Sequence, residues 1–246
     1  MSDEKKTAAE ETAEAASETK KKKSLLSENA IEILVAVFLG ITALLTAWAS
    51  WIGSLHGGNQ ATNYTKSNNL ASEGNSEYNA GLQDYLSDVM VWNTYNEYLF
   101  ERDIAEANGN EEEVRLIEEK IENYLAQNGS QILQDAFEQM ENDSSINSPF
   151  DISGMTDKYY EHANELLAES QELLEEGKKD NANGDSYNLV NVIYSVVLFM
   201  LGIVGVFRRL PNRAAVLCIA VVGLIATTIY MVTIPMPTGF SFSNFF

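Results

Sequence analysis

The sequence is poor in the residues that build metal, redox and disulfide sites. It contains one cysteine and two histidines in 246 residues. Cys218 lies inside an apolar run, so it can form no intramolecular disulfide, and we expect it to serve packing rather than chemistry. His56 and His162 are far apart, and the spacings typical of zinc sites are missing. We therefore expect no bound metal and no cofactor.

Basic residues are also scarce. The chain has 16 Lys and Arg against 36 Asp and Glu, which gives a net charge of −20. Residues 53–187 alone hold 28 acidic and 7 basic residues, so nearly all of the net charge belongs to this segment. Such a surface repels nucleic acid phosphates and anionic lipid headgroups. We therefore expect neither nucleic acid nor an anionic lipid surface to be a partner of this segment.

Signatures of strands and of catalysis are missing as well. No segment shows the sustained apolar–polar alternation of a half-buried strand, and no hairpin turn joins two β-branched runs. No nucleophile is paired with a recognisable base, and no phosphate-binding glycine loop occurs. The sequence therefore predicts an all-α protein that is not an enzyme.

Three apolar segments are present, at residues 33–52, 189–207 and 214–234. Each is long enough to cross a bilayer as a helix. Basic residues flank them on one predicted side, and the positive-inside rule places that side in the cytoplasm. These topology-determining residues are Lys20, Lys21, Lys22 and Lys23 before the first segment, and Arg208, Arg209 and Arg213 between the second and third.

This pattern predicts a multi-pass plasma-membrane protein with three transmembrane helices and a helical bundle or hairpin inserted between the first two. The expected parts are a disordered cytoplasmic tail (1–29), helix 1 (30–53), an acidic extracytoplasmic domain (54–186), helix 2 (187–207), a cytoplasmic turn (208–213), helix 3 (214–234) and an extracytoplasmic tail (235–246). A cleaved signal peptide is the rival interpretation, since Ala47-Trp48-Ala49 resembles a cleavage site.

The acidic insert is expected to be helical. Apolar residues recur at helical spacing over 111–127, in a short piece around 132–140, and over 157–177. Residues 142–155 have the composition of a loop. Residues 180–185 superficially resemble a calcium loop, but position twelve is Asn191 rather than Glu. We expect the Asn- and Gly-rich residues 181–184 to interrupt the helix before the second span.

A seven-residue rhythm marks the first span and continues beyond it, which predicts one long rod or two collinear rods joined near Gly57-Gly58. The rod would reach roughly 100 Å. Its predicted packing seam can face later helices of the same chain or a second copy. In the span the seam comprises Ala36, Gly40, Ala43, Ala47, Ser50 and Ser54; beyond it, Ala61, Tyr64, Asn68, Ala71, Asn75, Tyr78, Leu82, Tyr85, Val89, Trp92, Asn96 and Leu99.

The second span carries a small and polar face at Asn191, Ser195, Gly202 and Gly205. Such a face permits close helix–helix approach in a membrane. No charged residue lies deep in any of the three spans, whereas conduction pathways usually contain ionisable groups. We interpret this face as a packing surface, and a pathway would require an oligomer.

Two stretches near the predicted membrane boundaries carry a resemblance. They are residues 51–64 (WIGSLHGGNQATNY) and 181–192 (NANGDSYNLVNV), supported by Ser148-Pro149-Phe150 and Lys158-Tyr159-Tyr160. Here the chain resembles an uncharacterised family of three-span prokaryotic membrane proteins with a helical extracytoplasmic insert. The resemblance implies the same topology but no activity and no functional residue. Its members are often Arg-rich in the insert, whereas this chain is rich in Glu and Asn.

From these observations we expect a protein that works through protein–protein contact as a scaffold, sensor or accessory subunit. Its expected partners are the lipid bilayer and a second copy of the chain or other membrane proteins. A subunit of an oligomeric channel or transporter is the alternative.

Overall fold

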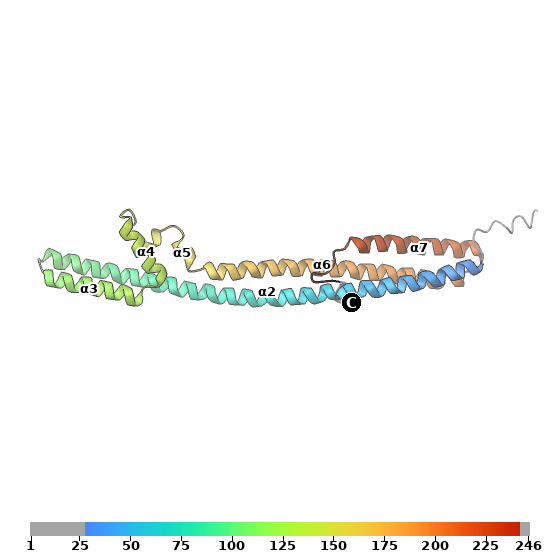
Figure 1. The fold of residues 1–246 in the computed structure, drawn as a ribbon, viewed down its shortest axis with the longest axis horizontal. Coiled ribbons are helices and arrows are strands. Elements are labelled where there is room, and N and C mark those ends of the chain that lie inside the picture. The colour runs from blue at the N-terminus through green and yellow to red at the C-terminus, as the bar shows by residue number, and fades with distance from the viewer. Residues whose placement is uncertain (1–27, 242–246) are drawn as a thin grey trace, which may run out of the picture. The chain divides into compact units, whose positions relative to one another are not determined.

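The computed structural model describes residues 28–241 and shows an all-α protein in which those residues form no strand (Figure 1). The lysine cluster at 20–23, the predicted disordered tail up to residue 27, and residues 242–246 lie outside the described residues. The elements are α2 (Glu28–Ala107), α3 (Glu111–Asn128), α4 (Gln131–Asn142), the 3-10 helix η1 (Pro149–Asp151), α5 (Met155–Lys158), α6 (Glu161–Ile203), the 3-10 helix η2 (Val204–Val206) and α7 (Leu210–Thr233).

The chain divides into two units. Unit 1 is formed by residues up to Asn59 together with those from Lys179 onward, and unit 2 by Gln60–Lys178. The two longest helices, α2 and α6, contribute residues to both units.

Both of these helices are uninterrupted where the sequence left room for a break. Helix α2 continues through Gly57 and Gly58, so the single-helix alternative is the one that the structure shows. The predicted interruption at 181–184 is wrong, because α6 runs from Glu161 to Ile203. A Cβ atom at Gly184 would lie 3.6 Å from the Cβ of His56 on α2. Close packing of the two helices here outweighs the low helix propensity of Asn and Gly.

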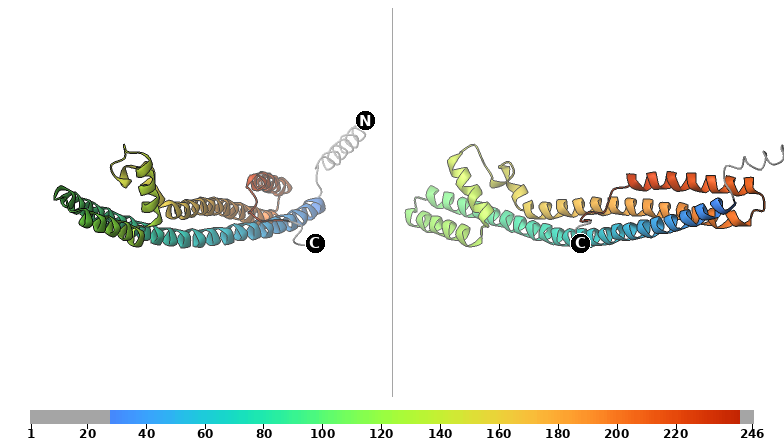
Figure 2. Two further views of the ribbon diagram at one scale, coloured as in Figure 1. Left: turned by 60° about the vertical axis from the view of Figure 1, so that its left-hand side comes forward. Right: turned by 45° about the vertical axis from the view of Figure 1, so that its right-hand side comes forward.

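Unit 1 consists of the first part of α2, the second part of α6 and α7, which lie side by side (Figures 1 and 2). The buried core lies between these three helices and contains residues from each of them, including Ile52, Tyr194 and Leu224. Tyr194 is fully buried, and its hydroxyl lies 3.0 Å from that of Thr228 on α7. Each of the three helices also keeps large apolar side chains on its outer face.

The exposed apolar residues of unit 1 lie on all three helices. They are Ile33, Val37, Ile41 and Leu44 on α2; Leu189, Val192, Val196 and Phe199 on α6; and Ile219, Val222, Ile225, Ile229 and Val232 on α7. A helix that is apolar on every side requires an apolar environment rather than water. Helices α2, α6 and α7 are each long and apolar enough to cross a membrane.

The connection between α6 and α7 lies earlier in the chain than the predicted turn at 208–213, because α6 ends at Ile203 and η2 follows it directly. Helix α7 begins at Leu210, and Pro211 lies in its first turn. Proline is tolerated there because the first N–H groups of a helix have no intrahelical partner. Arg208 and Arg209 are exposed in the connection.

Unit 2 is built on the later part of α2. Helix α3 returns along α2 after the turn at Gly109, and α4, η1 and α5 form a compact group on one side of α2 (Figures 1 and 2). The expected helices at 111–127 and 132–140 agree closely with α3 and α4. The expected helix at 157–177 is instead divided, since α5 ends at Lys158 and α6 begins at Glu161.

The core of unit 2 is rich in aromatic residues. Tyr85 makes edge contacts with the rings of Phe150 and Tyr159, at centroid distances of 5.5 Å and 5.6 Å. Trp92 lies beside Phe137 of α4, at 5.7 Å between ring centroids. Such ring pairs add stabilisation beyond the area they bury.

The face of α2 that packs in unit 2 only partly follows the predicted seam. Tyr78, Tyr85 and Trp92 do pack against other elements. Of the alternate seam positions, Asn68, Asn75 and Leu82 are exposed and Val89 is half-buried, and the buried residues are instead one position earlier, at Ser67, Gly74, Gly81 and Asp88. Two of these residues are glycines, and their small size lets other parts of the chain approach the α2 backbone.

Candidate functional site

The predicted seam residues of the first span lie on the outside of unit 1. Ala36, Gly40, Ala43, Ala47 and Ser50 are all exposed, and a Cβ atom at Gly40 would meet nothing within 4 Å. The face of α2 that does pack carries Thr42, Ala49 and Ile52, each fully buried. The expectation that the seam packs against later helices of the same chain is therefore not met in this unit.

The small and polar face of α6 is also largely uncovered. Ser195, Gly202 and Gly205 are exposed, and the two glycines have open space around their Cβ positions. The hydroxyl of Ser195 donates to the Asn191 carbonyl at 2.8 Å. The side-chain oxygen of Asn191 is buried without a hydrogen-bond partner. The structure brings these four residues together on one helix face, but not against the α2 seam residues as an internal interface.

A buried polar site lies in unit 1 where α2, α6 and the segment after α7 meet. His56 is 1% exposed and Asp180 is 7% exposed. The Nδ1 atom of His56 lies 2.7 Å from the carboxylate of Asp180, and its Nε2 atom lies 3.1 Å from the carbonyl oxygen of Pro235. The imidazole ring also stacks on Tyr187, with 5.8 Å between centroids. One side chain thus connects three separate segments.

The partners of His56 define the hydrogen-bond roles in this site. A backbone carbonyl can only accept, so Nε2 must donate to Pro235. In the second hydrogen bond, between Nδ1 and the Asp180 carboxyl group, either partner can carry the proton. This proton satisfies the second ring nitrogen of His56 and the Asp180 oxygen that faces it, which lowers the cost of burying the pair.

A second contact holds the same end of unit 1. The amide of Asn59 donates to the Thr238 carbonyl at 3.1 Å. Beside it, Phe240 makes edge contacts with the rings of Trp48 and Trp51, at 6.2 Å and 5.7 Å. The hollow between α2 and residues 237–241 has a volume of about 270 Å³. The segment after α7 is therefore attached to α2 through polar and aromatic contacts.

Arg213, one of the predicted topology-determining residues, takes part in an ion pair. Its Nη2 atom lies 3.2 Å from the Glu32 carboxylate on α2, and the arginine side chain is only 12% exposed. Its Nε atom is buried and has no hydrogen-bond partner among residues 28–241. Arg213 therefore joins the start of α7 to the start of α2, whereas Arg208 and Arg209 stay exposed.

Unit 2 contains its own buried polar cluster, centred on Asp88 of α2, which is 1% exposed. Its carboxylate accepts hydrogen bonds from the backbone N–H of Ser130 at 3.0 Å, from the Ser130 hydroxyl, and from the Tyr159 hydroxyl at 2.6 Å. Ser130 also caps α4, because its hydroxyl oxygen accepts from the N–H of Leu133. Burial raises the pKa of the Tyr159 hydroxyl, and the nearby Asp88 carboxylate raises it further. The cluster therefore fixes α4 and α5 to α2.

Two buried serines join α2 and α6 within unit 2. The Ser67 hydroxyl donates to the Ser170 carbonyl at 2.8 Å, and the Ser170 hydroxyl donates to the Ser67 carbonyl at 2.9 Å. This reciprocal pair satisfies both buried hydroxyls and brings the two backbones close together.

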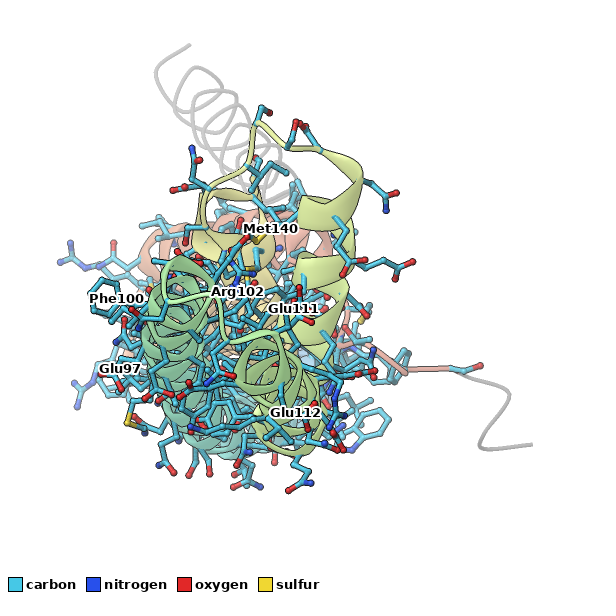
Figure 3. The ribbon with its side chains drawn as sticks, turned by 90° about the vertical axis from the view of Figure 1, so that its left-hand side faces the viewer. Glu97, Phe100, Arg102, Glu111, Glu112 and Met140 are labelled. Carbon is cyan, nitrogen blue, oxygen red and sulfur yellow. The ribbon has the colours of Figure 1, made fainter. Side chains whose placement is uncertain are left out.

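Unit 2 also exposes large apolar side chains on α2. They form a row, here named the α2 stripe, whose members are between 38% and 68% exposed: Leu82, Leu86, Met90, Phe100 and Ile104. At about 100° per residue, these five positions lie within about 80° of one another around the helix axis. Figure 3 shows Phe100 and Glu97 on the side of α2 that faces away from α3. The stripe is thus the outer face of the helix.

These arrangements have different chemical capacities. Among the described residues, no group of three or more His, Cys, Asp and Glu is placed to hold a metal ion. Both buried carboxylates are engaged by donors from distant parts of the chain. The pairing of His56 with Asp180 and the role of Asp88 were not predicted from the sequence. The only sequence signal for the burial of Asp88 is that it follows Ser67, Gly74 and Gly81 at seven-residue spacing. The α2 stripe is the surface best suited to bind another molecule.

Comparisons with known proteins add no assignment. No protein-family model, no curated protein and no solved structure matches this chain.

Proposed function

We propose that this protein is a plasma-membrane protein that binds a partner protein through an extracytoplasmic helical unit. In this proposal unit 1 lies in the bilayer, with residues 208–213 in the cytoplasm and unit 2 outside. The exposed apolar faces of α2, α6 and α7 support membrane insertion. The basic connection between α6 and α7 and the acidic composition of unit 2 support the orientation.

The observation that carries the binding function is the α2 stripe. Single exposed apolar residues are common on protein surfaces, but several large ones on one face of a helix usually mark an interaction site. The stripe lies on a unit whose other exposed residues are mainly acidic and polar, so the row is not part of a membrane-facing surface. A protein with this surface acts as a scaffold, sensor or accessory subunit.

Site-specific photo-crosslinking tests this function. A photoreactive amino acid replaces Phe100 in the stripe or Leu116 on α3, which is 51% exposed and lies outside the stripe. In cells, we expect a protein adduct from position 100 and none from position 116. Equal adducts from both positions, or none from position 100, would contradict a binding role for the stripe.

The alternative function, a subunit of an oligomeric channel or transporter, is favoured by a different observation. Small residues on α2 and Ser195, Gly202 and Gly205 on α6 are exposed within unit 1, and such faces allow transmembrane helices to associate closely. Gly40→Ile tests this idea, because none of the packed residues among 28–241 lies within 4 Å of the Cβ position. Native mass in mild detergent should fall to that of a monomer in the variant. A wild-type monomer would refute the oligomeric subunit.

A further inference from the structure

We propose that the α2 stripe binds a cationic amphipathic helix of a partner protein. This inference rests on the proposed function and specifies the chemistry of the partner. Three features of unit 2 carry it: the geometry of the stripe, an acid placed within the stripe, and the net charge of the unit.

The geometry favours a helix as the bound element. The stripe spans residues 82–104, which corresponds to about 33 Å along α2. Leu82, Leu86 and Met90 follow one another at four-residue spacing, as do Phe100 and Ile104. Rows at this spacing form the ridges that interdigitate with the side chains of another helix. An extended segment would need free backbone N–H and C=O groups at a sheet edge, and the interior of an α-helix offers none.

The middle of the stripe favours a positive charge on that helix. Between Met90 and Phe100, the same face of α2 carries Asn93 and Glu97. Both are exposed, and within the described part of the chain the Glu97 carboxylate makes no hydrogen bond and no ion pair. A partner that covers the stripe removes water from this carboxylate. Burying this carboxylate unpaired would carry a large desolvation penalty, so the partner must supply a Lys or Arg opposite Glu97.

The charge of the whole unit points the same way. Residues 60–178 contain 26 acidic and 6 basic residues, which gives a net charge of −20. A second copy of the chain would bring an equal negative charge to the interface, and the two would repel. A basic partner is attracted at long range, which raises its association rate and disfavours acidic competitors. The expected occupant therefore has leucine-like residues on one face and Lys or Arg on its flanks.

The test uses the full chain in phosphatidylcholine nanodiscs and a fluorescent peptide of about 22 residues, the length that matches the stripe. The peptide carries leucines on one helical face and lysines beside them. A matched peptide has glutamate at every lysine position. Fluorescence anisotropy measures binding, and empty nanodiscs measure adsorption of each peptide to lipid.

We expect the lysine peptide to bind the wild-type protein at least about tenfold more tightly than the Leu86→Ser/Phe100→Ser variant, as the loss of two central apolar contacts implies. Glu97→Lys should weaken it by about fivefold or more, and added salt should narrow that difference. Leu116→Ser on α3 is the matched control and should bind within about twofold of wild type, because it lies outside the stripe. The four substituted positions, 86, 97, 100 and 116, are all exposed, so these variants should keep the fold.

Three results would overturn the inference. The lysine peptide could bind the wild type and the stripe variant equally, the glutamate peptide could bind as tightly as the lysine peptide, or two labelled copies of the protein could associate through the stripe. The crosslinking experiment distinguishes these failures from failure of the proposed function. An adduct at position 100 with a non-helical or acidic partner segment would retain the binding function and remove the cationic helix.

Discussion

Gly81 should be among the most sensitive positions in unit 2, although the substitution considered is only glycine to alanine. A Cβ atom at this position would overlap the backbone carbonyl of Tyr159. A backbone group cannot move aside as the end of a flexible side chain can. Residues 159–160, between α5 and α6, would have to shift away from α2. The Tyr159 hydroxyl, which donates to the buried Asp88 carboxylate, would shift with them.

The magnitude follows from three contributions. Overpacking of this kind costs about 1–3 kcal/mol. Weakening a hydrogen bond to a buried charged group costs about 1.5–3 kcal/mol. Replacing glycine by alanine inside a helix contributes about 1 kcal/mol in the opposite direction. We therefore expect Gly81→Ala to lower the free energy of unfolding of unit 2 by about 1.5–5 kcal/mol.

Gly57 provides a matched control on the same helix. It lies in the interior of α2 in unit 1, and a Cβ atom there meets nothing within 4 Å. Only the propensity contribution remains, so Gly57→Ala should stabilise the helix locally by up to about 1 kcal/mol. The same substitution thus has opposite signs at two positions.

Hydrogen–deuterium exchange with mass spectrometry on the full chain in detergent can resolve both effects. Peptides from α4 and α5 should exchange about tenfold faster or more in Gly81→Ala, since opening of these segments becomes easier by at least about 1.5 kcal/mol. Peptides around residue 57 should be unchanged or slower in Gly57→Ala. Unchanged exchange of α4 and α5 in Gly81→Ala would refute the close approach of the Tyr159 backbone to α2.

Three further predictions concern charge and topology. The pKa of Tyr159 is raised in the folded protein, so its contribution to stability is complete below about pH 10, the ordinary pKa of tyrosine, and is lost as the pH rises above that value. Tyr159→Phe should therefore flatten the loss of helicity at alkaline pH. An unchanged slope would contradict this reasoning. His56→Leu should destabilise unit 1 by about 3 kcal/mol, because it leaves the Asp180 carboxylate buried without its histidine partner. In thermal unfolding, the double variant His56→Leu/Asp180→Leu should recover part of this loss. A double variant less stable than the single one would argue against the pair. In a background without the native cysteine, a membrane-impermeant maleimide should label Glu112→Cys and not Asn212→Cys in intact cells, and the reverse pattern would invert the proposed orientation.

The sequence by itself determined the helical class, the three apolar helices and the acidic charge of the intervening segment. These properties follow from composition and from apolar runs, which depend only on neighbouring residues. The bounds of α3 and α4 were predictable for the same reason, since apolar spacing, the acids of the first turn and polar capping residues are local signals. The absence of strands among the described residues followed from the lack of alternating patterns.

Only the tertiary structure decided which face of each helix is buried. A seven-residue rhythm gives the period of a helix but not its partner, so the small residues at Gly40 and Ala43 looked like a packing seam and are exposed within the chain. In unit 2 the buried positions include Gly81, whose role depends on a carbonyl far along the chain.

The polar sites depended on the fold for the same reason. His56 meets Asp180 across 124 positions, and Asp88 meets Tyr159 across 71. No local pattern links residues so far apart, because their proximity is created when separate helices pack. Packing also kept α6 helical through its Asn- and Gly-rich stretch, where the local propensity predicted a break.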